Sequence, residues 1–178
     1  VLSDASAPHR IERLRPQRSV GRVAQRHGHL LASAVDLDVT EELQAIAGKG
    51  QKIIYRHQGE MATITSDKQL LRNIFINLLN NAIKYSNEDG IIEFTSEINH
   101  DIHFAVKDSG IGIPREEQKQ LFDRFFRASN VTNIQGTGLG LNIVRRYTEL
   151  LDGEIRFESE AGSGTTFSLT FPLTAKKP

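Results

Sequence analysis

Residues 70–85 read Leu-Leu-Arg-Asn-Ile-Phe-Ile-Asn-Leu-Leu-Asn-Asn-Ala-Ile-Lys-Tyr. At about 100° per residue, the apolar side chains cover most of a helix over this stretch, which predicts that the helix is largely buried. Asn costs about half a kcal/mol relative to Ala in a helix interior, so we expect the polar positions to have a role. These positions fall within one arc of about 100° and form a stripe of amides and one cation: Asn73, Asn77, Asn80, Asn81 and Lys84.

The polar stripe has two interpretations. In the structural one, the amides form hydrogen bonds with neighbouring loops, as buried polar groups generally do. In the functional one, the amide oxygens and the ammonium group face a hydrated Mg²⁺ ion and phosphates, for which neutral oxygen ligands and one cation are suited. The stripe by itself leaves both interpretations open.

Strands and helices surround this central helix on both sides in the sequence. Asp67 is placed to cap its start, and Asp38 with Glu41 resembles a capping box that opens an earlier helix ending at Gly48. A further helix is expected after Gly136, up to Leu151. Pro114 is expected to open a short helix. Alternating and short apolar runs predict strands over 52–55, 62–65, 91–98, 102–107, 154–158 and 165–171.

This mixture of hairpins and helices predicts the α+β class. We expect a two-layer α/β sandwich, in which about three helices cover a mixed but mostly antiparallel sheet. With 178 residues, the chain is long enough to bury a core without disulfides or a structural metal. It has no Cys, which excludes thiolate zinc sites and cysteine nucleophiles.

Charge and hydropathy limit the partners of the chain. The 22 Lys and Arg residues balance the 22 Asp and Glu residues, so no global field would attract nucleic acid or an anionic membrane. No stretch approaches the roughly 18 consecutive apolar residues of a membrane span, and the N-terminus lacks an apolar signal core. We therefore expect a cytoplasmic fragment without nucleic-acid or membrane contact, whose parent protein can still be membrane-anchored.

The first part of the chain differs in composition from the rest. Residues 1–37 are rich in Arg and His and contain no Lys, so we expect a linker or a remnant of a dimerisation domain there. Apolar spacing over 20–34 permits an amphipathic helix, which two glycines weaken. The predicted organisation is this N-terminal segment, a folded domain over 38–174 and a tail over 175–178.

A second motif, Asp108-Ser109-Gly110-Ile111-Gly112, directly follows an expected strand. A carboxylate at a strand end, beside glycines that expose the backbone, could accept a hydrogen bond from the exocyclic amine of a flat ligand. Taken alone, an Asp-Ser-Gly sequence is usually only a turn.

A third motif, Gly136-Thr137-Gly138-Leu139-Gly140-Leu141, precedes a helix, where backbone N–H groups and the helix dipole can hold phosphate. The spacing is neither that of the dinucleotide fingerprint nor that of a Walker loop. A single glycine cluster is weak evidence for a phosphate site.

Together and in this order, the motifs resemble one family. Residues 77–85 resemble the N box, residues 108–112 the first glycine box, Phe122-Asp-Arg-Phe-Phe126 the F box, and residues 136–141 the second glycine box. The chain thus resembles the catalytic ATP-binding domain of a sensor histidine kinase, within the Bergerat-fold (GHKL) ATPase superfamily.

The resemblance implies that ATP and Mg²⁺ bind here. It implies that Asn81 coordinates Mg²⁺, that Asn77 and Lys84 lie near the phosphates, and that Asp108 accepts a hydrogen bond from the adenine amino group. Tyr85 would lie against the nucleoside. The remaining residues that the resemblance brings to the ATP site are Gly110, Gly112, Ile113, Phe125, Gly136, Thr137, Gly138, Leu139, Gly140, Leu141, Thr165 and Thr166.

The F box and the residues after it are implied to form a mobile lid over 123–135, from which Arg124 or Arg127 reaches the γ-phosphate or the partner domain. ATP-hydrolysing members of the superfamily carry a Glu where this chain has Asn77. An amide cannot accept a proton from the attacking water, which disfavours an autonomous ATPase but allows transfer to an external nucleophile.

In the family that nucleophile is a histidine on a separate helical dimerisation domain, whose product serves a response regulator. The usual phosphoacceptor motif is absent from this chain, so the enzyme is expected to be incomplete and to need that domain in the parent chain or in trans. A nucleotide-binding interaction module without phosphotransfer is the alternative function.

Overall fold

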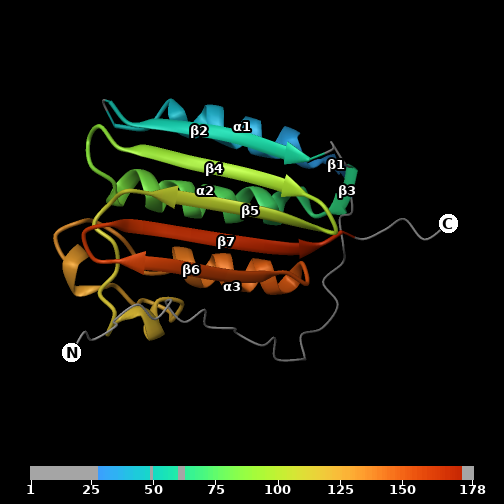
Figure 1. Cartoon of the computed structure of the whole chain (residues 1–178). Helices are drawn as coiled ribbons and strands as arrows, with labels where there is room; N and C mark the ends of the chain where they lie inside the picture. The colour runs from blue at the N-terminus through green and yellow to red at the C-terminus, as the bar shows by residue number, and fades with distance from the viewer. Residues whose placement is uncertain (1–27, 49, 60–62, 174–178) are drawn as a thin grey trace, which may run out of the picture.

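A five-stranded sheet is the framework of the molecule. The computed structural model describes residues 28–48, 50–59 and 63–173. The strand order is β2-β4-β5-β7-β6, from the top to the bottom of Figure 1. These strands are β2 (Lys52–Gly59), β4 (Ile91–Ile98), β5 (Asp101–Asp108), β7 (Gly164–Pro172) and β6 (Glu154–Glu160). Only β2 and β4 pair in parallel, and the other neighbours are antiparallel.

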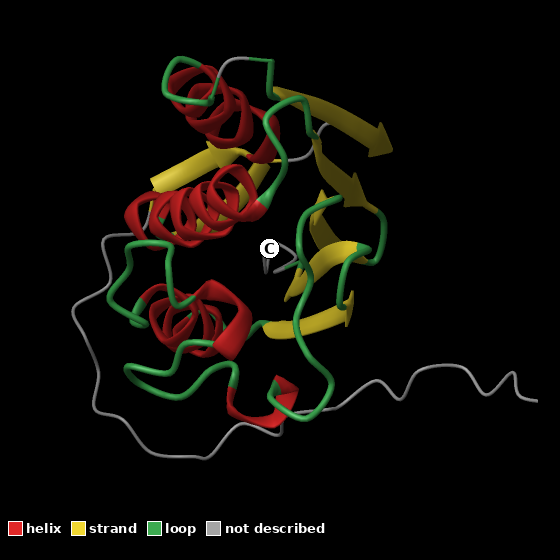
Figure 2. Ribbon diagram, turned by 90° about the vertical axis from the view of Figure 1, so that its left-hand side faces the viewer, coloured by secondary structure: helices red, strands yellow, loops and turns green. Residues whose placement is uncertain are grey.

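Helices cover one face of this sheet, which gives the molecule two layers (Figure 2). The helices are α1 (Ala32–Gln44), α2 (Lys68–Tyr85) and α3 (Gly140–Leu150). The predicted fold class is therefore confirmed: the chain is an open α+β sandwich with a mixed, mostly antiparallel sheet.

Helix α2 forms where the sequence predicts it: its start is specified locally, and its end is held by a side chain from a distant part of the sequence. The Asp67 carboxylate accepts hydrogen bonds from the backbone nitrogens of Gln69 (2.9 Å) and Leu70 (3.1 Å), which makes it the N-cap. At the other end, the buried Gln51 side chain donates to the carbonyl oxygens of Ile83 (2.8 Å) and Asn87 (3.1 Å). Gln51 thereby satisfies the Ile83 carbonyl, which a helix end would leave unpaired, and holds the turn that follows α2.

The core lies between α2 and the sheet. Phe75 of α2 packs against Phe94 of β4 and Phe104 of β5, with ring centroids 5.1 Å and 4.8 Å apart. All three rings are buried, and tilted or edge-on ring pairs of this kind are favourable. This packing buries the apolar side of α2, so its polar stripe turns away from the aromatic cluster.

The antiparallel pairing of β5 with β7, which are far apart in the sequence, brings the end of β5 beside the start of β7. Along β5 the buried side chains alternate with the others, as the sequence predicts, and the last residue, Asp108, pairs with Thr165. Because side chains alternate between the faces of a sheet, both of these residues lie on the helix-covered side.

Three sequence predictions differ from the structure. Helix α1 begins at Ala32 and ends at Gln44, so the expected start at Asp38 and end at Gly48 are wrong. Residues 28–31 form strand β1, which pairs with β3 (Thr63–Ser66) in a small second sheet, so they are not part of an amphipathic helix. Residues 32–34 of that expected helix belong to α1, and residues 20–27 lie outside the described residues.

The third difference follows Pro114, where turns and the short 3₁₀ helix η1 (Gln118–Gln120) replace the expected helix. Another 3₁₀ helix, η2 (Ser129–Val131), lies within the expected lid. The predicted domain boundary at residues 37 and 38 falls inside α1, which runs through it without interruption. That boundary stays a prediction, and the tail over 175–178 lies outside the described residues.

Candidate functional site

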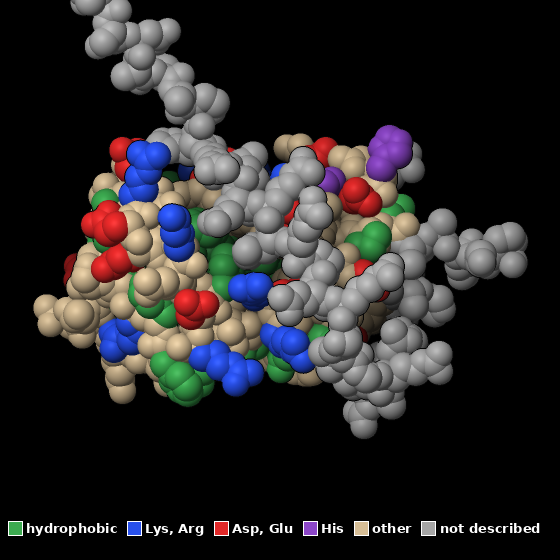
Figure 3. Space-filling model, turned by 90° about the horizontal axis from the view of Figure 1, so that it is seen from below, with side chains coloured by type: hydrophobic (Ala, Val, Ile, Leu, Met, Phe, Trp, Pro, Cys, Tyr) green, Lys and Arg blue, Asp and Glu red, His purple; other side chains and the backbone are tan. Residues whose placement is uncertain are grey.

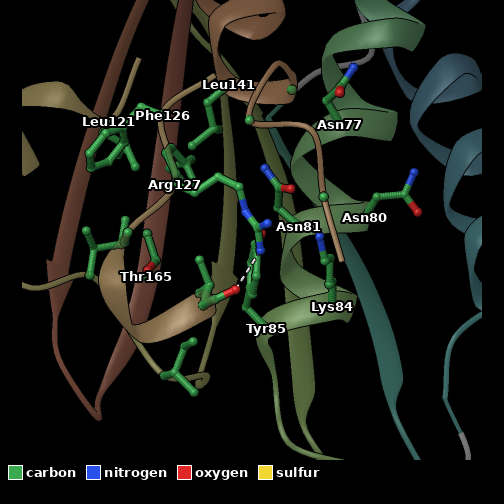
Figure 4. A pocket seen from close by; sticks show the side chains of 18 of the residues that line it. Asn77, Asn80, Asn81, Lys84, Tyr85, Leu121, Phe126, Arg127, Leu141 and Thr165 are labelled. Carbon is green, nitrogen blue, oxygen red and sulfur yellow. Dashed lines mark hydrogen bonds between the residues drawn. The ribbon is translucent and has the colours of Figure 1, made fainter. Parts of the chain in front are cut away.

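The three motifs meet at one cavity of about 490 Å³ between α2, the sheet and the loop before α3 (Figure 4). Motifs far apart in the sequence thus contribute to one site. The residues of the sequence-predicted site that line this cavity are Asn77, Asn81, Lys84, Tyr85, Asp108, Gly112, Ile113, Arg127, Gly136, Thr137, Gly138, Leu139, Gly140, Leu141 and Thr165.

The polar stripe of α2 forms one wall, with Asn77, Asn80, Asn81 and Lys84 among the lining residues. The Asn77 side-chain nitrogen donates to the carbonyl oxygen of Asn73 (2.8 Å), which is the preceding turn of the same helix. The Asn77 oxygen lies 3.0 Å from the position that a Cβ on Gly140 would take. A side chain at Gly140 would therefore crowd this amide, which explains why a glycine suits the position.

Lys84 supplies a positive charge to the same wall. Its ammonium nitrogen lies 5.0 Å from the centroid of the Tyr85 ring, and no acidic group pairs with it among the described residues. A Cβ on Gly136 would approach this nitrogen to 2.6 Å, so the glycine loop comes close to the charge because it has no side chain there. Such a cation is available to an anionic ligand.

Asp108 forms the opposite end of the cavity, at the end of β5. It is 8% exposed, and its Oδ1 atom accepts hydrogen bonds from the backbone nitrogens of Gly110 (2.9 Å) and Thr165 (3.3 Å). Burial raises the pKa of the Asp108 carboxyl above its ordinary value, and the two hydrogen bonds oppose this rise without cancelling it. The second carboxylate oxygen has no protein donor among the described contacts, which leaves it as an acceptor for a ligand.

The glycine loop precedes α3 and faces the stripe. Gly138 has a φ of 70°, and its carbonyl oxygen accepts a hydrogen bond from the backbone nitrogen of Phe125 (3.0 Å). A Cβ on Gly138 would lie 2.6 Å from the Phe125 carbonyl carbon, so a glycine is required by both conformation and space. Within the described part of the chain, no side chain caps the start of α3 at Gly140, so the N–H groups of its first turn can bind an anion at this end of the cavity.

Residues 123–135, called the lid segment below, border the cavity on the side away from α2. Arg127 extends from this segment across the cavity in Figure 4. Its guanidinium donates to the carbonyl oxygen of Val131 (2.6 Å) and to that of Ile134, and its buried Nε atom has no partner in the part of the chain that is described. In this structure, Arg127 therefore holds the lid segment in its fold.

Four residues of the sequence-predicted site do not line the cavity. Gly110 lies behind it and positions Asp108 through its backbone nitrogen. Thr166 follows the inward-facing Thr165 and so belongs to the opposite face of the sheet. Arg124 and Phe125 are exposed, the latter to 71% with a φ of 63°.

On the face seen in Figure 3, separate hydrophobic side chains lie among basic and acidic ones.

The sequence interpretation missed most of the apolar lining, because these residues look like ordinary core positions. Asn80 was recognised in the stripe without being assigned to the site. The lining residues missing from the predicted site are Asn80, Ile111, Leu121, Phe126, Ala128, Asn130, Val131, Ile143 and Phe167.

The cavity is chemically divided. One end offers amides, an unpaired ammonium group and a helix N-terminus, which suits a polyanion. The other end offers a buried carboxylate and apolar walls, which suits a flat ring with a hydrogen-bond donor. The fold and the site together define a domain for a ligand that combines such a ring with phosphates.

Comparisons with known proteins agree with this class. Residues 66–175 match the family described as Histidine kinase-, DNA gyrase B-, and HSP90-like ATPase. Sensor histidine kinase WalK of Bacillus subtilis is 36% identical over 111 residues, which are 60% of this chain and 18% of that protein. Heme sensor protein HssS of Staphylococcus saprophyticus is 34% identical over 152 residues, which are 85% of this chain and 29% of that protein.

Solved structures show the same fold. The nucleotide-free catalytic domain of histidine kinase ThkA has a TM-score of 0.70 and 26% identity, with 84% of this chain and 97% of that chain covered. Full-length ShkA in complex with AMPPNP has a TM-score of 0.74 and 26% identity, with 86% of this chain and 33% of that chain covered.

The chain therefore belongs to the histidine kinase-, DNA gyrase B- and HSP90-like ATPase family, and it has the fold and sequence motifs of the catalytic ATP-binding domain of a sensor histidine kinase. It spans a third or less of the length of the curated relatives cited and of others it matches. Among the described residues, none of the helices combines the length and apolar character that crossing a bilayer requires.

Proposed function

We propose that this domain binds Mg-ATP and transfers the γ-phosphoryl group to a histidine on a separate helical dimerisation domain. One observation carries the proposal: the polar stripe of α2 and the N-terminus of α3 line the same cavity whose other end holds Asp108. This arrangement supplies both a base site and a phosphate site. The relatives named as sensor histidine kinases support the same function.

The base end would hold adenine. The free oxygen of Asp108 would accept a hydrogen bond from the exocyclic amine, while Gly112, Ile113 and Thr165 line the same end. Guanine presents a carbonyl oxygen at the corresponding position, and two acceptors facing one another are unfavourable. A buried carboxylate thus favours ATP over GTP.

The phosphate end would hold the triphosphate. Lys84 and the backbone nitrogens at the start of α3 would bind phosphate oxygens, with Asn77 beside them. Arg127 would reach the γ-phosphate only after releasing the lid carbonyls that it now contacts. Arg124, which is exposed, would face the partner domain.

The residues at this end fit a magnesium ion. No cluster of three or more acidic, His or Cys side chains able to hold a metal occurs in the described ranges, so an ion there would rely on amide oxygen, water and nucleotide phosphates. Mg²⁺ commonly binds in this way, with one or two protein ligands. Asn81 lines the cavity beside Lys84 and would be the ligand; the ion would neutralise phosphate charge.

The chemical step would break the bond between the γ-phosphorus and the bridging oxygen of ADP and form a bond from that phosphorus to a histidine ring nitrogen. ADP leaves with the electron pair of the broken bond. Asn77 cannot accept a proton from water at neutral pH, so the site favours an external nucleophile over hydrolysis. The remaining task of the domain is to position and shield the phosphates.

The partner of this reaction would be a histidine-bearing dimerisation domain, in the parent chain or in trans, followed by a response regulator. None of the described histidines fits the role. His29, His57 and His103 lie within strands, and His100 lies in the turn between β4 and β5. We further propose the division into a linker over 1–37, the catalytic domain over 38–174 and a short tail.

Two measurements test the proposal. Calorimetry with AMP-PNP, with and without Mg²⁺, should show saturable binding that magnesium strengthens. Incubation with labelled ATP and an added histidine-bearing helical domain should then produce an acid-labile phosphohistidine on that domain. Binding without labelled histidine would overturn phosphotransfer and support a nucleotide-dependent interaction module, whereas absence of binding by the folded protein would overturn the nucleotide site itself.

A further inference from the structure

The lid segment is attached to the rest of the domain at two separated places. At the glycine loop, the backbone nitrogen of Phe125 donates to the Gly138 carbonyl oxygen (3.0 Å). At the loop that follows β5, the Asn130 side-chain nitrogen donates to the Gly112 carbonyl oxygen (2.9 Å). The first contact lies at the phosphate end and the second at the base end of the cavity.

The acceptor of the second contact has a fixed position. Gly112 has a φ of 62° and packs against the Glu160 carbonyl group so closely that a side chain would collide with it. The flanking residues are held as well: Gly162 donates to the Ile111 carbonyl (2.8 Å), and Ile113 donates to the Ser159 hydroxyl (2.9 Å). Gly112 is therefore a firm anchor.

Asn130 is also in contact with the ligand space. Asn130 lines the cavity, as does Gly112. The backbone nitrogen of the neighbouring Ser129 donates a hydrogen bond to the Glu117 carboxylate (2.9 Å). The Asn130 amide thus connects the lid segment to the wall on which a base would lie. None of these contacts involves the residues of the phosphate end.

We propose that Asn130 is a positioning residue for the base end, which fixes the lid against Gly112 independently of the phosphates. This inference rests on the proposed function, which assigns adenine to Asp108 and Gly112. The hydrogen bond stabilises the lid conformation seen here, in which Asn130 lines the cavity with Gly112, so it raises the population of that conformation. A ligand's apparent affinity scales with that population, and the coupling is reciprocal.

The test compares three variants of the full chain. Asn130→Asp has nearly the same shape but cannot donate to the Gly112 carbonyl, and Asn130→Ala removes the side chain without adding charge. Asn133→Ala is the matched control, because Asn133 lies in the same segment, is exposed and does not line the cavity. The probes are adenosine, which is neutral and has no phosphate, and AMP-PNP with Mg²⁺.

Both Asn130 variants should have an affinity for adenosine that is about three- to tenfold lower, which is the usual range for one lost hydrogen bond. Asn130→Ala should weaken AMP-PNP by the same factor, because both ligands share the base end. Amide hydrogen exchange should become faster at residues 111–113 and 128–131 without a change in β4 and β5. Asn133→Ala should match the parent chain in every measurement.

Unchanged adenosine affinity in both Asn130 variants would overturn the inference. Weaker binding of AMP-PNP alone would also overturn it, because the lid would then act on the phosphates and not on the base. These outcomes are distinguishable from failure of the proposed function. In that case, the parent chain itself would bind neither probe.

Discussion

The backbone nitrogen of Ile111 donates a hydrogen bond to the carbonyl oxygen of Tyr85 (3.1 Å). Tyr85 is the last residue of α2, and Ile111 belongs to the loop that begins after Asp108. This hydrogen bond connects the wall that carries the polar stripe to the wall that carries the carboxylate, in addition to the packing of Phe75 against Phe104. It therefore contributes to the separation of the two ends of the cavity.

Gly110→Ala should disturb this connection. A Cβ at Gly110 would collide with the Tyr85 carbonyl oxygen and would lie 2.9 Å from an Asp108 carboxylate oxygen. We expect a loss of about 1–3 kcal/mol in the free energy of unfolding, which is typical of overpacking, and weaker AMP-PNP binding. Urea denaturation and calorimetry measure the two effects.

The control for this change is Ser109→Ala, because Ser109 is the exposed neighbour of Gly110. Its stability should stay within about 0.5 kcal/mol of the parent chain, as for most surface substitutions. Equal stability of the two variants would show that the loop can move away from α2 without cost.

Asp108→Asn should separate binding from stability. The pKa of Asp108 is raised because burial disfavours its charged form. The stability that this carboxyl contributes is therefore fully present below its unfolded-state pKa, and it is lost as pH rises through its folded-state pKa. Asn carries no charge and can accept the same two backbone hydrogen bonds. The free energy of unfolding of the variant, relative to the parent, should therefore increase as pH rises from about 4 towards neutrality.

At neutral pH the same variant should bind AMP-PNP about tenfold more weakly, because its amide oxygen is held by Gly110 and Thr165, so a donor NH2 group faces the donor amine of adenine. Denaturation curves at several pH values and calorimetry at one pH provide both results. Parallel stability profiles for the two proteins would contradict the assigned effect of burial.

Asn81→Ala should abolish most of the magnesium dependence of nucleotide binding. If Asn81 supplies the amide oxygen ligand, affinity for AMP-PNP should fall by about tenfold with Mg²⁺ present and much less without it. Asn73→Ala is the matched control, because Asn73 belongs to the same stripe of α2 but does not line the cavity. A retained magnesium effect in Asn81→Ala would assign the ion to other ligands.

Gln51→Ala should destabilise the domain without contacting any ligand. Gln51 is 7% exposed, donates to the carbonyl oxygens of Ile83 and Asn87, and accepts from the backbone nitrogen of Gly48 (2.9 Å). Its removal leaves the part-buried Ile83 carbonyl and Gly48 N–H without this partner, at a cost of about 1–3 kcal/mol. Urea denaturation should detect this loss, while the exposed Gln58→Ala on β2 should leave the midpoint nearly unchanged.

Local signals in the sequence were sufficient for most of the fold. The N-cap at Asp67, the apolar face of α2 and the alternation along β4 and β5 each act over a few residues and were identified correctly. Strand β1 could not be recognised, because it has only 4 residues and its partner β3 lies far along the chain. The predicted start of α1 is wrong because Asp38 and Glu41, which resemble a capping box, lie within the helix.

For the candidate site, the sequence indicated residue types but not distances. The stripe, Asp108 and the glycine loop were recognised as separate motifs, and their common location was expected only from a family resemblance. Arg127 illustrates what remained hidden: its contacts with two lid carbonyls depend on the path of the chain after residue 127. Asn130 gave no signal, since a single Asn in a polar stretch is unremarkable.

The two attachments of the lid leave its outermost part outside every contact described above. Thr132 and Asn133 are exposed and lie between the two carbonyl groups that Arg127 holds. The chain contains no cysteine, so Asn133→Cys would create a unique attachment point for a fluorophore. A dye at this tip would turn the domain into a reporter that signals lid movement while the ligand cavity keeps its native side chains.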